Sequence, residues 1–354
     1  MLKQAYEFQI SGRPLSCESY GNGHINETYL LKDSNNSKYI LQKINTNVFR
    51  DPESLMRNVE AVTAHFKKNG AGERECLTLV PALSGQNWHV DGDGQYWRMY
   101  DFVRDSICLE KAERPEDFRE SGAAFGQFQR RMADFPAQRL IETIQRFHDT
   151  PNRYALLRGA VAADSAGRAS AVRREIDFAL AREDYAGLLV NLQASGEMPA
   201  RVTHNDTKMN NVLLDGVTRK ALCVVDLDTV MPGLAVNDFG DSIRFGASSA
   251  AEDEPDLDRV AFVPELFEAY TDGFLSACGA SLTHCELEHM RDGAKMMTLE
   301  VGVRFLTDYL SGDVYFRTSR PDHNLDRCRT QFKLVRDMER HWDHMQRIIL
   351  SKSL

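Results

Sequence analysis

Four oxygen-bearing side chains lie close together along one stretch of this chain of 354 residues. Asp206 and Asn211 stand five residues apart in a polar loop, and Asp226 and Asp228 follow an apolar run. The residues between them, 212–225, form two short apolar segments joined by an Asp-Gly turn signal, which predicts a hairpin. A hairpin of this size brings its two polar ends side by side. Carboxylate and carboxamide oxygens are the ligands that Mg²⁺ prefers, so this stretch predicts a metal site.

The spacing of these residues is also the spacing used for phosphoryl transfer. Protein kinases place H-R-D-x-x-x-x-N before D-F-G, and this chain has Asp-Leu-Asp in place of D-F-G. In that chemistry Asp206 would orient the acceptor hydroxyl and accept its proton. Asn211 and Asp226 would hold Mg²⁺ between the phosphates of ATP, and Asp228 would be a second ligand or an outer-shell acid. A phosphoryl-transfer site also needs groups that hold the nucleotide.

A glycine-containing turn near the N-terminus is the first candidate for binding phosphate. Gly21, Gly23 and Asn26 lie between two strand-like segments. Glycines let backbone N–H groups approach a phosphate closely. Only two of the three glycines of G-x-G-x-x-G are present, so an ordinary hairpin turn is the alternative.

A lysine on the next predicted strand is the second candidate. In the segment Lys38–Val48, Lys43 lies on the same face of the predicted strand as Tyr39 and Leu41, where a lysine is costly unless it meets an anion. A solvent-exposed lysine is the alternative. A helix opening at Asp51-Pro52 carries Glu60 at the edge of its apolar stripe, where it could pair with Lys43. Glu53 is the competing partner, and a surface glutamate is the alternative for both.

The remaining part of the first hundred residues predicts two more strands, Leu77–Leu83 and Gln95–Val103. The second runs into the helical part of the chain, where a kinase has the hinge that pairs with adenine. The hinge candidates are Tyr100, Asp101 and Phe102, with core packing as the alternative. We therefore expect an N-terminal lobe over residues 1–103 and a C-terminal lobe over residues 104–354.

The C-terminal part has the amphipathic spacing of helices. Residues 236–246 place Asp238, Asp241 and Arg244 on what could be a single helical face, with Phe245 beside it, and Asp238 is a candidate for bracing the catalytic loop. Three long helices are predicted after it, Arg259–Cys278, His284–Leu310 and Asn324–Leu350. Arg304 lies within the second among mostly apolar neighbours, so it should anchor something anionic or polar.

Composition narrows the function classes. The chain has 42% hydrophobic and 27% charged residues, a net charge of −9, and scattered basic residues, so nucleic acid is not an expected partner. No apolar run reaches the length of about 20 residues that a membrane span requires. Seven cysteines without a Cys-x-x-Cys motif indicate free thiols in a reducing cytoplasm. We expect a cytoplasmic protein that is a monomer or a weak homodimer.

The catalytic segment resembles the aminoglycoside phosphotransferase and choline kinase superfamily, which has H-x-D-x-x-x-x-N and a following I-D-x-[DE]. In this chain the two motifs are His204–Asn211 and Val225–Asp228. The resemblance covers nearly the whole sequence. It implies an α+β, bilobal protein-kinase-like fold, in which an N-terminal antiparallel sheet lobe with one helix precedes a larger, mainly helical C-terminal lobe. It also implies ATP and Mg²⁺ as cofactors.

A narrower resemblance concerns four segments, GNGHINETY, THNDTKMNNVLLD, VDLDTVMPG and DFGDSIRFGA, which are similar to those of bacterial N-acetylhexosamine 1-kinases. Those enzymes phosphorylate the anomeric C1 hydroxyl of N-acetylglucosamine and N-acetylgalactosamine. The resemblance implies Asp206 as the base and Asn211 and Asp226 as metal ligands. The candidates for the sugar site are His24, Asp241, Arg244, Phe245 and Arg304.

Two alternatives stay open at this point. The acceptor could be another small hydroxyl compound, such as homoserine, choline or an aminoglycoside. Aminoglycoside kinases need an acidic cleft and choline kinases an aromatic cage. The C-terminal third shows no dense acidic cluster beside the catalytic loop, although the run Glu252–Asp258 is acidic. The chain could also be a non-catalytic nucleotide-binding protein, against which the intact Lys43, Asp206, Asn211 and Asp226 argue.

Overall fold

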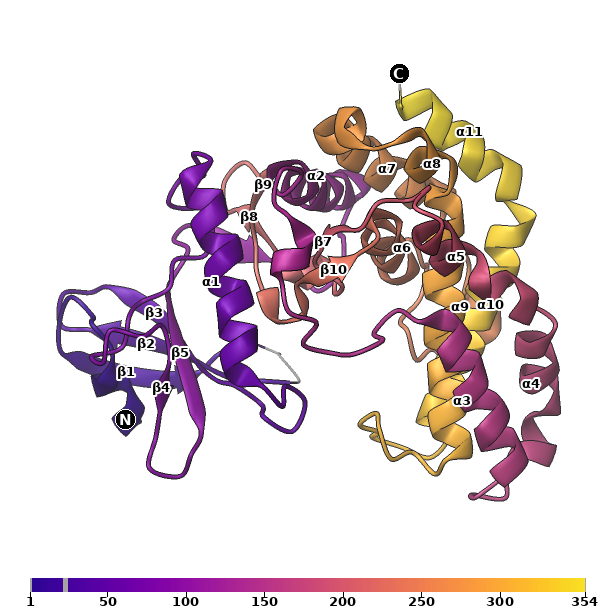
Figure 1. Ribbon diagram of the computed structural model, residues 1–354, viewed down its shortest axis with the longest axis horizontal. Helices are drawn as coiled ribbons and strands as arrows, with labels where there is room; N and C mark the ends of the chain where they lie inside the picture. Colours follow the sequence, from indigo (N-terminus) through magenta and orange to yellow (C-terminus); the bar gives the residue numbers. More distant parts are fainter. Residues whose placement is uncertain (1, 22–24, 354) are drawn as a thin grey trace. The chain divides into compact units, whose positions relative to one another are not determined.

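The computed structural model describes residues 2–21 and 25–353. The chain forms two compact units (Figure 1). The first comprises Met1–Ile107, Asp134–Gln145 and Leu213–Pro232. The second comprises Cys108–Ala133, Arg146–Val212 and Gly233–Leu354. An antiparallel sheet dominates the N-terminal region and helices dominate the remainder, which confirms the predicted α+β, kinase-like fold class.

A five-stranded antiparallel sheet with the order β1-β2-β3-β5-β4 forms the centre of the first unit. Its strands are β1 (Pro14–Ser19), β2 (Glu27–Asp33), β3 (Lys38–Lys43), β4 (His89–Val90) and β5 (Tyr96–Asp101). Side chains on a strand alternate between its two faces, so one face of each strand is apolar. Leu31, Leu41 and Met99 are fully buried on that face and pack with Trp97.

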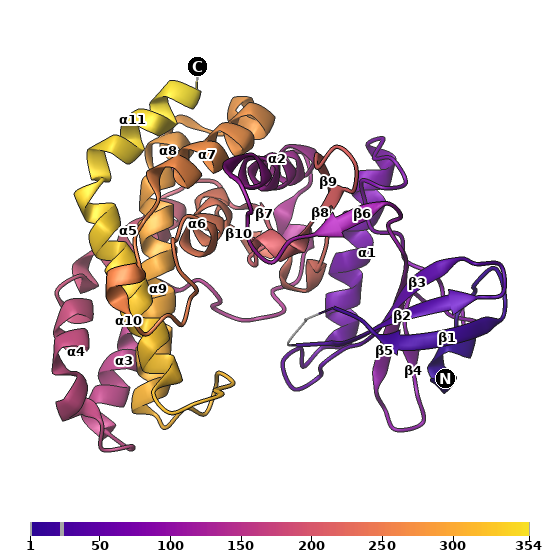
Figure 2. The same ribbon diagram turned by 180° about the vertical axis from the view of Figure 1, so that it is seen from behind.

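The helix α1 (Pro52–Lys68) lies alongside this sheet in both views (Figures 1 and 2). It begins where the sequence predicts, because the Asp51 carboxylate accepts a hydrogen bond from the Ser54 N–H at 3.0 Å and Pro52 occupies the first turn. Leu55, Val59 and Val62 form its fully buried stripe.

The prediction of a strand over Leu77–Leu83 is wrong. This segment makes two isolated bridges, Leu79 with Tyr100 and Ala82 with Phe8. Beside β5, the Val80 N–H donates to the Met99 carbonyl and the Asp101 N–H donates to the Thr78 carbonyl. Pro81 has no N–H to donate, so the ladder cannot continue through it. The segment passes beside β5 and then leaves the sheet.

The predicted catalytic hairpin is present in a second, three-stranded sheet with the order β6-β8-β9 (Figure 2). Its strands are β6 (Ser106–Cys108), β8 (Val212–Asp215) and β9 (Ala221–Val224). The Asp215 carboxylate closes the turn by accepting hydrogen bonds from the N–H groups of Val217 and Thr218. The hairpin delivers Asp226 and Asp228 just beyond the end of β9.

Helices make up most of the second unit. They are α2 (Pro115–Arg131), α3 (Thr150–Ala163), α4 (Arg173–Leu180), α5 (Leu188–Ala194), α6 (Ala235–Gly246), α7 (Pro264–Cys278), α8 (His284–Glu288), α9 (Met290–Leu310), α10 (His323–Arg340) and α11 (Trp342–Lys352). The short strands β7 (Arg201–Thr203) and β10 (Met231–Gly233) flank the catalytic segment. The predicted helix Asn324–Leu350 is divided at His341, whose N–H bonds two carbonyls of the preceding turn and ends α10 there.

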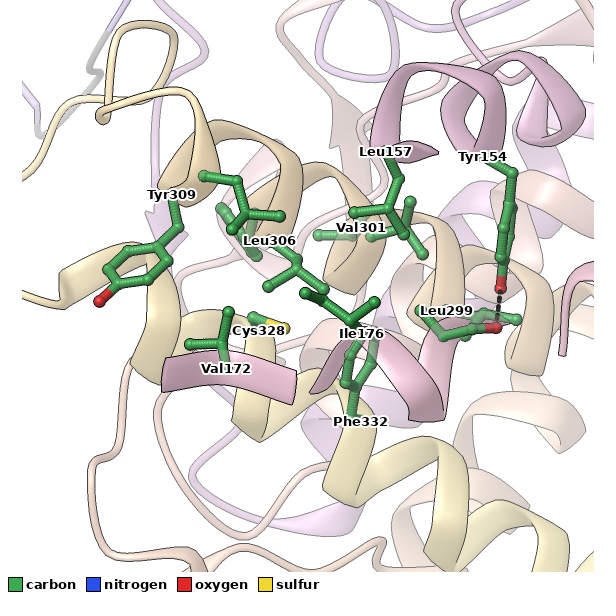
Figure 3. Packing of buried hydrophobic residues seen from close by; sticks show 14 of the residues in the cluster. Tyr154, Leu157, Val172, Ile176, Leu299, Val301, Leu306, Tyr309, Cys328 and Phe332 are labelled. Atoms are coloured by element: carbon green, nitrogen blue, oxygen red, sulfur yellow. Dashed lines mark hydrogen bonds between the residues drawn. The ribbon is translucent and has the colours of Figure 1, made fainter. Parts of the chain in front are cut away.

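One apolar cluster holds α3, α4, α9 and α10 together (Figure 3). Leu157, Ile176, Leu306 and Phe332 meet within it. Tyr154 is also buried there, and its hydroxyl donates to the Ala179 carbonyl at 3.2 Å. The buried hydroxyl is therefore satisfied, as a polar atom in a core must be. Helix α9 thus has a fixed position in this unit, which matters because Arg304 lies on it.

Glycines allow α2 and α7 to pack at very short range. A Cβ on Gly122 would lie 2.3 Å from the Tyr270 carbonyl oxygen, and one on Gly273 would lie 1.9 Å from the Arg119 carbonyl oxygen. We therefore expect Gly122→Ala to lower the free energy of unfolding by about 2 kcal/mol, because a backbone oxygen cannot move aside. Denaturant unfolding measures this.

Gly159→Ala on α3 is the matched control, because this exposed helical glycine has no heavy atom within 4 Å of an added Cβ. It should be stabilising by about 0.5–1 kcal/mol through helix propensity. Equal stabilities of the two variants would contradict the close packing of α2 on α7.

All seven cysteines are free thiols, as the sequence predicts. Within the described part of the chain, no helix is both long and apolar enough to cross a membrane.

Candidate active site

The carboxylate of Asp206 is held from two sides by its own loop. Lys208 Nζ lies 2.9 Å from one oxygen, and Asn211 Nδ2 donates to the other at 2.9 Å and to the Asp206 carbonyl at 2.8 Å. The charge of Asp206 raises the pKa of Lys208 to about 12, so this lysine is a cation at neutral pH. About a quarter of the Asp206 side chain stays exposed, which leaves room for an acceptor hydroxyl.

Helix α6 fixes the backbone of this loop. Asp238, which is almost fully buried, accepts hydrogen bonds from the N–H groups of His204 and Asn205, both at 2.8 Å, and from Gln129 Nε2 at 2.9 Å. Asn205 has a φ of 63°, a left-handed conformation that costs free energy in a non-glycine residue. The Asp238 carboxylate therefore holds the loop in a strained shape immediately before Asp206.

A second carboxylate on α6 holds the other side of Asp206. Asp241 accepts a hydrogen bond from the Thr207 N–H at 3.0 Å and is paired with Arg244 at 2.9 Å. Arg244 also pairs with Glu252. The buried Asp241 and Arg244 and the part-exposed Glu252 thus form one chain of charges that ends at the loop of Asp206.

The charges on α6 differ in their electrostatic environment. Burial raises the pKa of Asp238 above its ordinary value, because its neighbours are N–H donors and not strong cations. Burial also acts against the charged form of Asp241, but the positive charges of Arg244 and Lys208 outweigh it, and the pKa of Asp241 lies below its ordinary value. Asp241 is therefore the carboxylate with compensating cations.

Two of the residues predicted for the sugar site, Asp241 and Arg244, are already engaged by other protein groups. Asp241 and Arg244 are engaged with the catalytic loop and with each other. Phe245 follows Arg244 and lines, with Arg244 and Glu252, a small cavity of about 10 Å³. His24, the fourth candidate from this group, lies outside the described residues.

Arg304 on α9 contacts aromatic rings. Its guanidinium lies 5.5 Å from the ring centroids of Phe147 and Phe316 and 6.0 Å from that of Tyr315. Arg153 donates to the Phe147 carbonyl at 2.7 Å, and burial together with the charge of Arg304 lowers its pKa. Neither arginine has a carboxylate within ion-pair distance among the described residues. Both guanidinium groups interact electrostatically with the buried carboxylate of Glu300, which offsets part of their charge.

The oxygen donors predicted for a metal suit a hard cation. Asn211 uses its amide N–H₂ on Asp206, so its amide oxygen is the atom left to face a ligand. Asp226 follows β9 in a left-handed conformation, with a φ of 60°. Over residues 2–21 and 25–353, no group of three or more His, Cys, Asp or Glu side chains is gathered at metal-binding distances. The donor types fit Mg²⁺ chemically.

In the first unit, Lys43 does not pair with Glu60. Lys43 Nζ lies 3.4 Å from a Glu27 oxygen, and these two residues are direct partners in the β2–β3 register. Glu60 instead accepts a hydrogen bond from Asn87 Nδ2 at 2.8 Å. The competing candidate, Glu53, accepts one from the Tyr96 hydroxyl at 3.3 Å. The predicted Lys43–Glu60 pair is therefore corrected to a Lys43–Glu27 pair.

Lys43 also lines a polar cavity. The cavity has a volume of about 170 Å³ and is formed by Glu27, Asn45, Gln95 and neighbouring residues of this unit. Ile25, near the end of the predicted phosphate loop, also lines it. Gly21 has a φ of 75°, as a tight turn requires, whereas Gly23 lies outside the described residues. Asn26 Nδ2 donates a hydrogen bond to Asp228 Oδ2 at 2.6 Å.

The hinge candidates follow one another at the end of β5. Tyr100 is buried, and its ring lies 5.3 Å from the Arg98 guanidinium. The N–H groups of Asp101 and Phe102 donate to the carbonyls of Thr78 and Lys38, so neither is left to bond adenine. A nucleotide base paired here would have to use other backbone groups of this segment.

Sequence reasoning missed two residues of this site, Lys208 and Arg98. Lys208 stands two positions after Asp206, inside the motif itself, and its spacing was a usable signal. Arg98 is a charged residue within the apolar run of β5, and it is only 1% exposed. Such a residue must have a buried partner, but the sequence gives no indication of which one.

A helix-braced aspartate, a following Asn and a β-hairpin ending in Asp-Leu-Asp are the arrangement expected of a kinase-like phosphotransferase. The sequence pattern of the APH family, described as a phosphotransferase enzyme family, matches residues 16–274. The match spans more than half of the chain, and the chain belongs to this family.

Solved structures with a similar fold support the assignment. An amicoumacin kinase in complex with AMP-PNP, Ca²⁺ and amicoumacin is 15% identical with a TM-score of 0.64, covering 94% of this chain and 91% of that one. A microcompartment-associated aminopropanol kinase is 15% identical with a TM-score of 0.61 and covers 97% of both chains. A choline kinase from Cryptosporidium parvum is 14% identical with a TM-score of 0.57, covering 96% and 93%. At these identities the likeness concerns the fold.

Proposed function

We propose that this protein is an ATP- and Mg²⁺-dependent sugar kinase that phosphorylates the anomeric C1 hydroxyl of N-acetylhexosamines. The observation that carries the proposal is the environment of Asp206. Its carboxylate is partly exposed and is fixed by Lys208 and Asn211, on a loop that α6 braces. A carboxylate held in this way can orient a hydroxyl and take its proton, which is what phosphoryl transfer requires of the protein.

The nucleotide is assigned to groups on both sides of the catalytic segment. Asn211 and Asp226 would hold the metal. Mg²⁺, when bound, neutralises charge on the phosphate oxygens as the phosphoryl group leaves. Lys43 and the turn that begins at Gly21 would contact the phosphates.

Lys208 adds a second positive charge beside the base. Its Nζ lies within ion-pair distance of Asp206, and its raised pKa keeps it charged at neutral pH. A cation here can interact with the phosphoryl group as it moves toward the acceptor. The base and a charge that stabilises the transferred group would then come from the same loop.

The charge around Arg304 supports a neutral acceptor. Choline and aminopropanol, named for two of the structural neighbours, carry a cationic nitrogen, and aminoglycosides carry several. Arg153 and Arg304 would disfavour such cations, although the buried Glu300 carboxylate offsets part of their charge. An acetamide carbonyl or a hydroxyl can accept hydrogen bonds from a guanidinium. Aromatic rings beside Arg304 suit the apolar face of a sugar ring. His24 and Phe245 remain candidates for the same acceptor.

The seven free thiols support a reducing compartment, and we propose a cytoplasmic enzyme that acts as a monomer or a weak homodimer.

An acceptor panel tests the proposal. ATP, Mg²⁺ and the purified protein are combined separately with N-acetylglucosamine, N-acetylgalactosamine, glucosamine, homoserine, choline and an aminoglycoside, and ADP release is followed. We expect kcat/KM for at least one N-acetylhexosamine to exceed that for every cationic acceptor by about 100-fold. Glucosamine is the matched control, because it lacks only the acetyl group and carries a charge instead. If kcat/KM were higher for choline or homoserine, the protein would still be a phosphotransferase, but N-acetylhexosamines would not be its acceptors.

A further inference from the structure

Asp228 has both carboxylate oxygens engaged within the first unit. Arg98 Nη1 donates to Oδ1, and Asn26 Nδ2 donates to Oδ2 at 2.6 Å. The Asp228 side chain is 3% exposed and that of Arg98 is 1% exposed. Coordination by this buried carboxylate would bring a cation close to the Arg98 guanidinium on Oδ1 and the Asn26 amide on Oδ2, and like charges repel.

Arg98 depends on Asp228 for its charge balance. Its Nε donates to Gln42 Oε1 at 3.0 Å, and Gln42 in turn donates to the Thr28 hydroxyl at 3.0 Å. These contacts join strands β5, β3 and β2. Within the described residues, Asp228 is the carboxylate that forms an ion pair with Arg98. Turning Asp228 toward a metal would leave a buried guanidinium without its counter-charge, which is strongly unfavourable.

Asn26 is fixed at both ends of its side chain. Its amide N–H₂ reaches Asp228, and its Oδ1 accepts a hydrogen bond from the Asn45 N–H at 3.0 Å. Asn45 also donates to the Ile25 carbonyl at 3.1 Å. At the other end of the turn, the Tyr20 N–H donates to the Thr28 carbonyl at 2.9 Å. Asn26 therefore anchors the C-terminal end of the segment that begins at Gly21.

From these contacts we infer that Asp228 is a positioning residue, which ties the phosphate-binding turn to the Asp-Leu-Asp segment through Asn26 and does not ligate the metal. This assignment rests on the proposed function, because the turn is a phosphate site only if the protein binds ATP. Asp226 then remains the metal-binding carboxylate of the pair. The role of Asp228 is to hold Asn26, and through it the backbone of Asn45, against the segment that carries Asp226.

Nucleotide binding tests this inference without any acceptor. Isothermal titration calorimetry with a non-hydrolysable ATP analogue gives the dissociation constant at several Mg²⁺ concentrations. Asn26→Ala cuts the link but leaves the Arg98–Asp228 pair in place. We expect it to weaken analogue binding about tenfold, because Asn26 no longer ties Asn45 to Asp228 before the analogue binds. The Mg²⁺ concentration that gives half of the full Mg²⁺ enhancement of analogue binding should stay within about twofold. Thermal unfolding should shift by less than about 5 °C.

Two further variants separate positioning from metal ligation. Asp226→Asn should raise the Mg²⁺ concentration that gives half of the full Mg²⁺ enhancement of analogue binding by about tenfold or more, because a metal ligand is lost. Asp228→Asn should weaken analogue binding but leave that concentration unchanged. If the unpaired buried charge of Arg98 prevents Asp228→Asn from folding, the double variant Arg98→Met, Asp228→Asn removes both charges together. Analogue binding and its Mg²⁺ dependence can then be measured on the double variant.

The outcomes are distinct. A Mg²⁺ dependence shifted by Asp228→Asn as far as by Asp226→Asn would make Asp228 a ligand and overturn the inference. Wild-type analogue affinity in Asn26→Ala would also overturn it. If the wild-type protein itself binds no ATP analogue, the proposed function fails first. If the protein binds the analogue but phosphorylates no sugar, the proposed acceptor is wrong, and the binding measurements still decide the role of Asp228.

Discussion

Asp206→Asn is expected to lower kcat about a thousandfold while the affinity for an ATP analogue stays within about threefold. Asparagine keeps the shape of the side chain but cannot accept the proton of the acceptor hydroxyl. It also loses the ion pair with Lys208, which lies 2.9 Å away. Because the base acts on the acceptor and not on the nucleotide, the effect should appear in kcat. ADP release at saturating substrates and calorimetry with the analogue measure the two quantities.

Asp177→Asn is the control for Asp206→Asn. Asp177 forms an exposed i,i+4 pair with Arg173 on α4, and exposed pairs of this kind contribute little. The control should keep wild-type kcat. A fully active Asp206→Asn enzyme would remove Asp206 from the catalytic role, and an equal loss of analogue affinity would place Asp206 at the nucleotide instead.

Asp238→Ala is expected to lower the free energy of unfolding by about 4 kcal/mol. The change removes the carboxylate that accepts from three buried donors, the N–H groups of His204 and Asn205 and the Gln129 amide, at about 1–3 kcal/mol each. Burial raises the pKa of Asp238, so removing a carboxylate with a desolvation cost offsets part of this loss. Denaturant unfolding at neutral pH measures the change.

The same variant should lose activity even where it is fully folded. Asn205 is held in a left-handed conformation next to Asp206, and without Asp238 this strained backbone is free to relax. We expect kcat per folded molecule to fall about tenfold or more at a temperature well below the unfolding transition. Asp177→Ala is the surface control for stability. A variant with unchanged stability and unchanged kcat would show that α6 does not brace the catalytic loop.

Local patterns in the sequence predicted the catalytic segment well. The two strands of the hairpin, the Asp-Gly turn and the position of Asp226 and Asp228 beyond the second strand are all present. So are the helix that begins at Pro52 and the role of Asp238 as a brace. These features depend on residues close together in the sequence, on turn chemistry and on helix caps, which can be recognised without the fold.

Contacts between residues far apart in the sequence could not be predicted from local patterns. Lys43 meets Glu27 because they are opposite each other in the β2–β3 register, and a register shifted by two residues would have given Lys43 a different partner. Asp228 meets Arg98 and Asn26, which lie 130 and 202 residues away. The sequence alone identified each of Asp228 and Asn26 as functional candidates but could not show that they contact each other.

The acceptor-side residues illustrate the same limit. Asp241 and Arg244 stand on one face of α6, as the spacing predicts, but their contacts are with Thr207 and with each other. Helical periodicity identifies a shared face and does not say what that face meets. Arg304 was expected to anchor something anionic or polar; its described neighbours are aromatic rings, and its charge also lowers the pKa of the buried Glu300 carboxylate.

The position of the new phosphate is the most direct measurement of the central claim. Wild-type protein, ATP and Mg²⁺ are incubated with ¹³C-labelled N-acetylglucosamine or N-acetylgalactosamine, and the product is examined by ³¹P and ¹³C NMR. The proposed function predicts a phosphorus coupled to the anomeric carbon and proton, and no such product with Asp206→Asn over the same time. Phosphate coupled to C6, or no phosphorylated sugar from the wild-type protein, would contradict it.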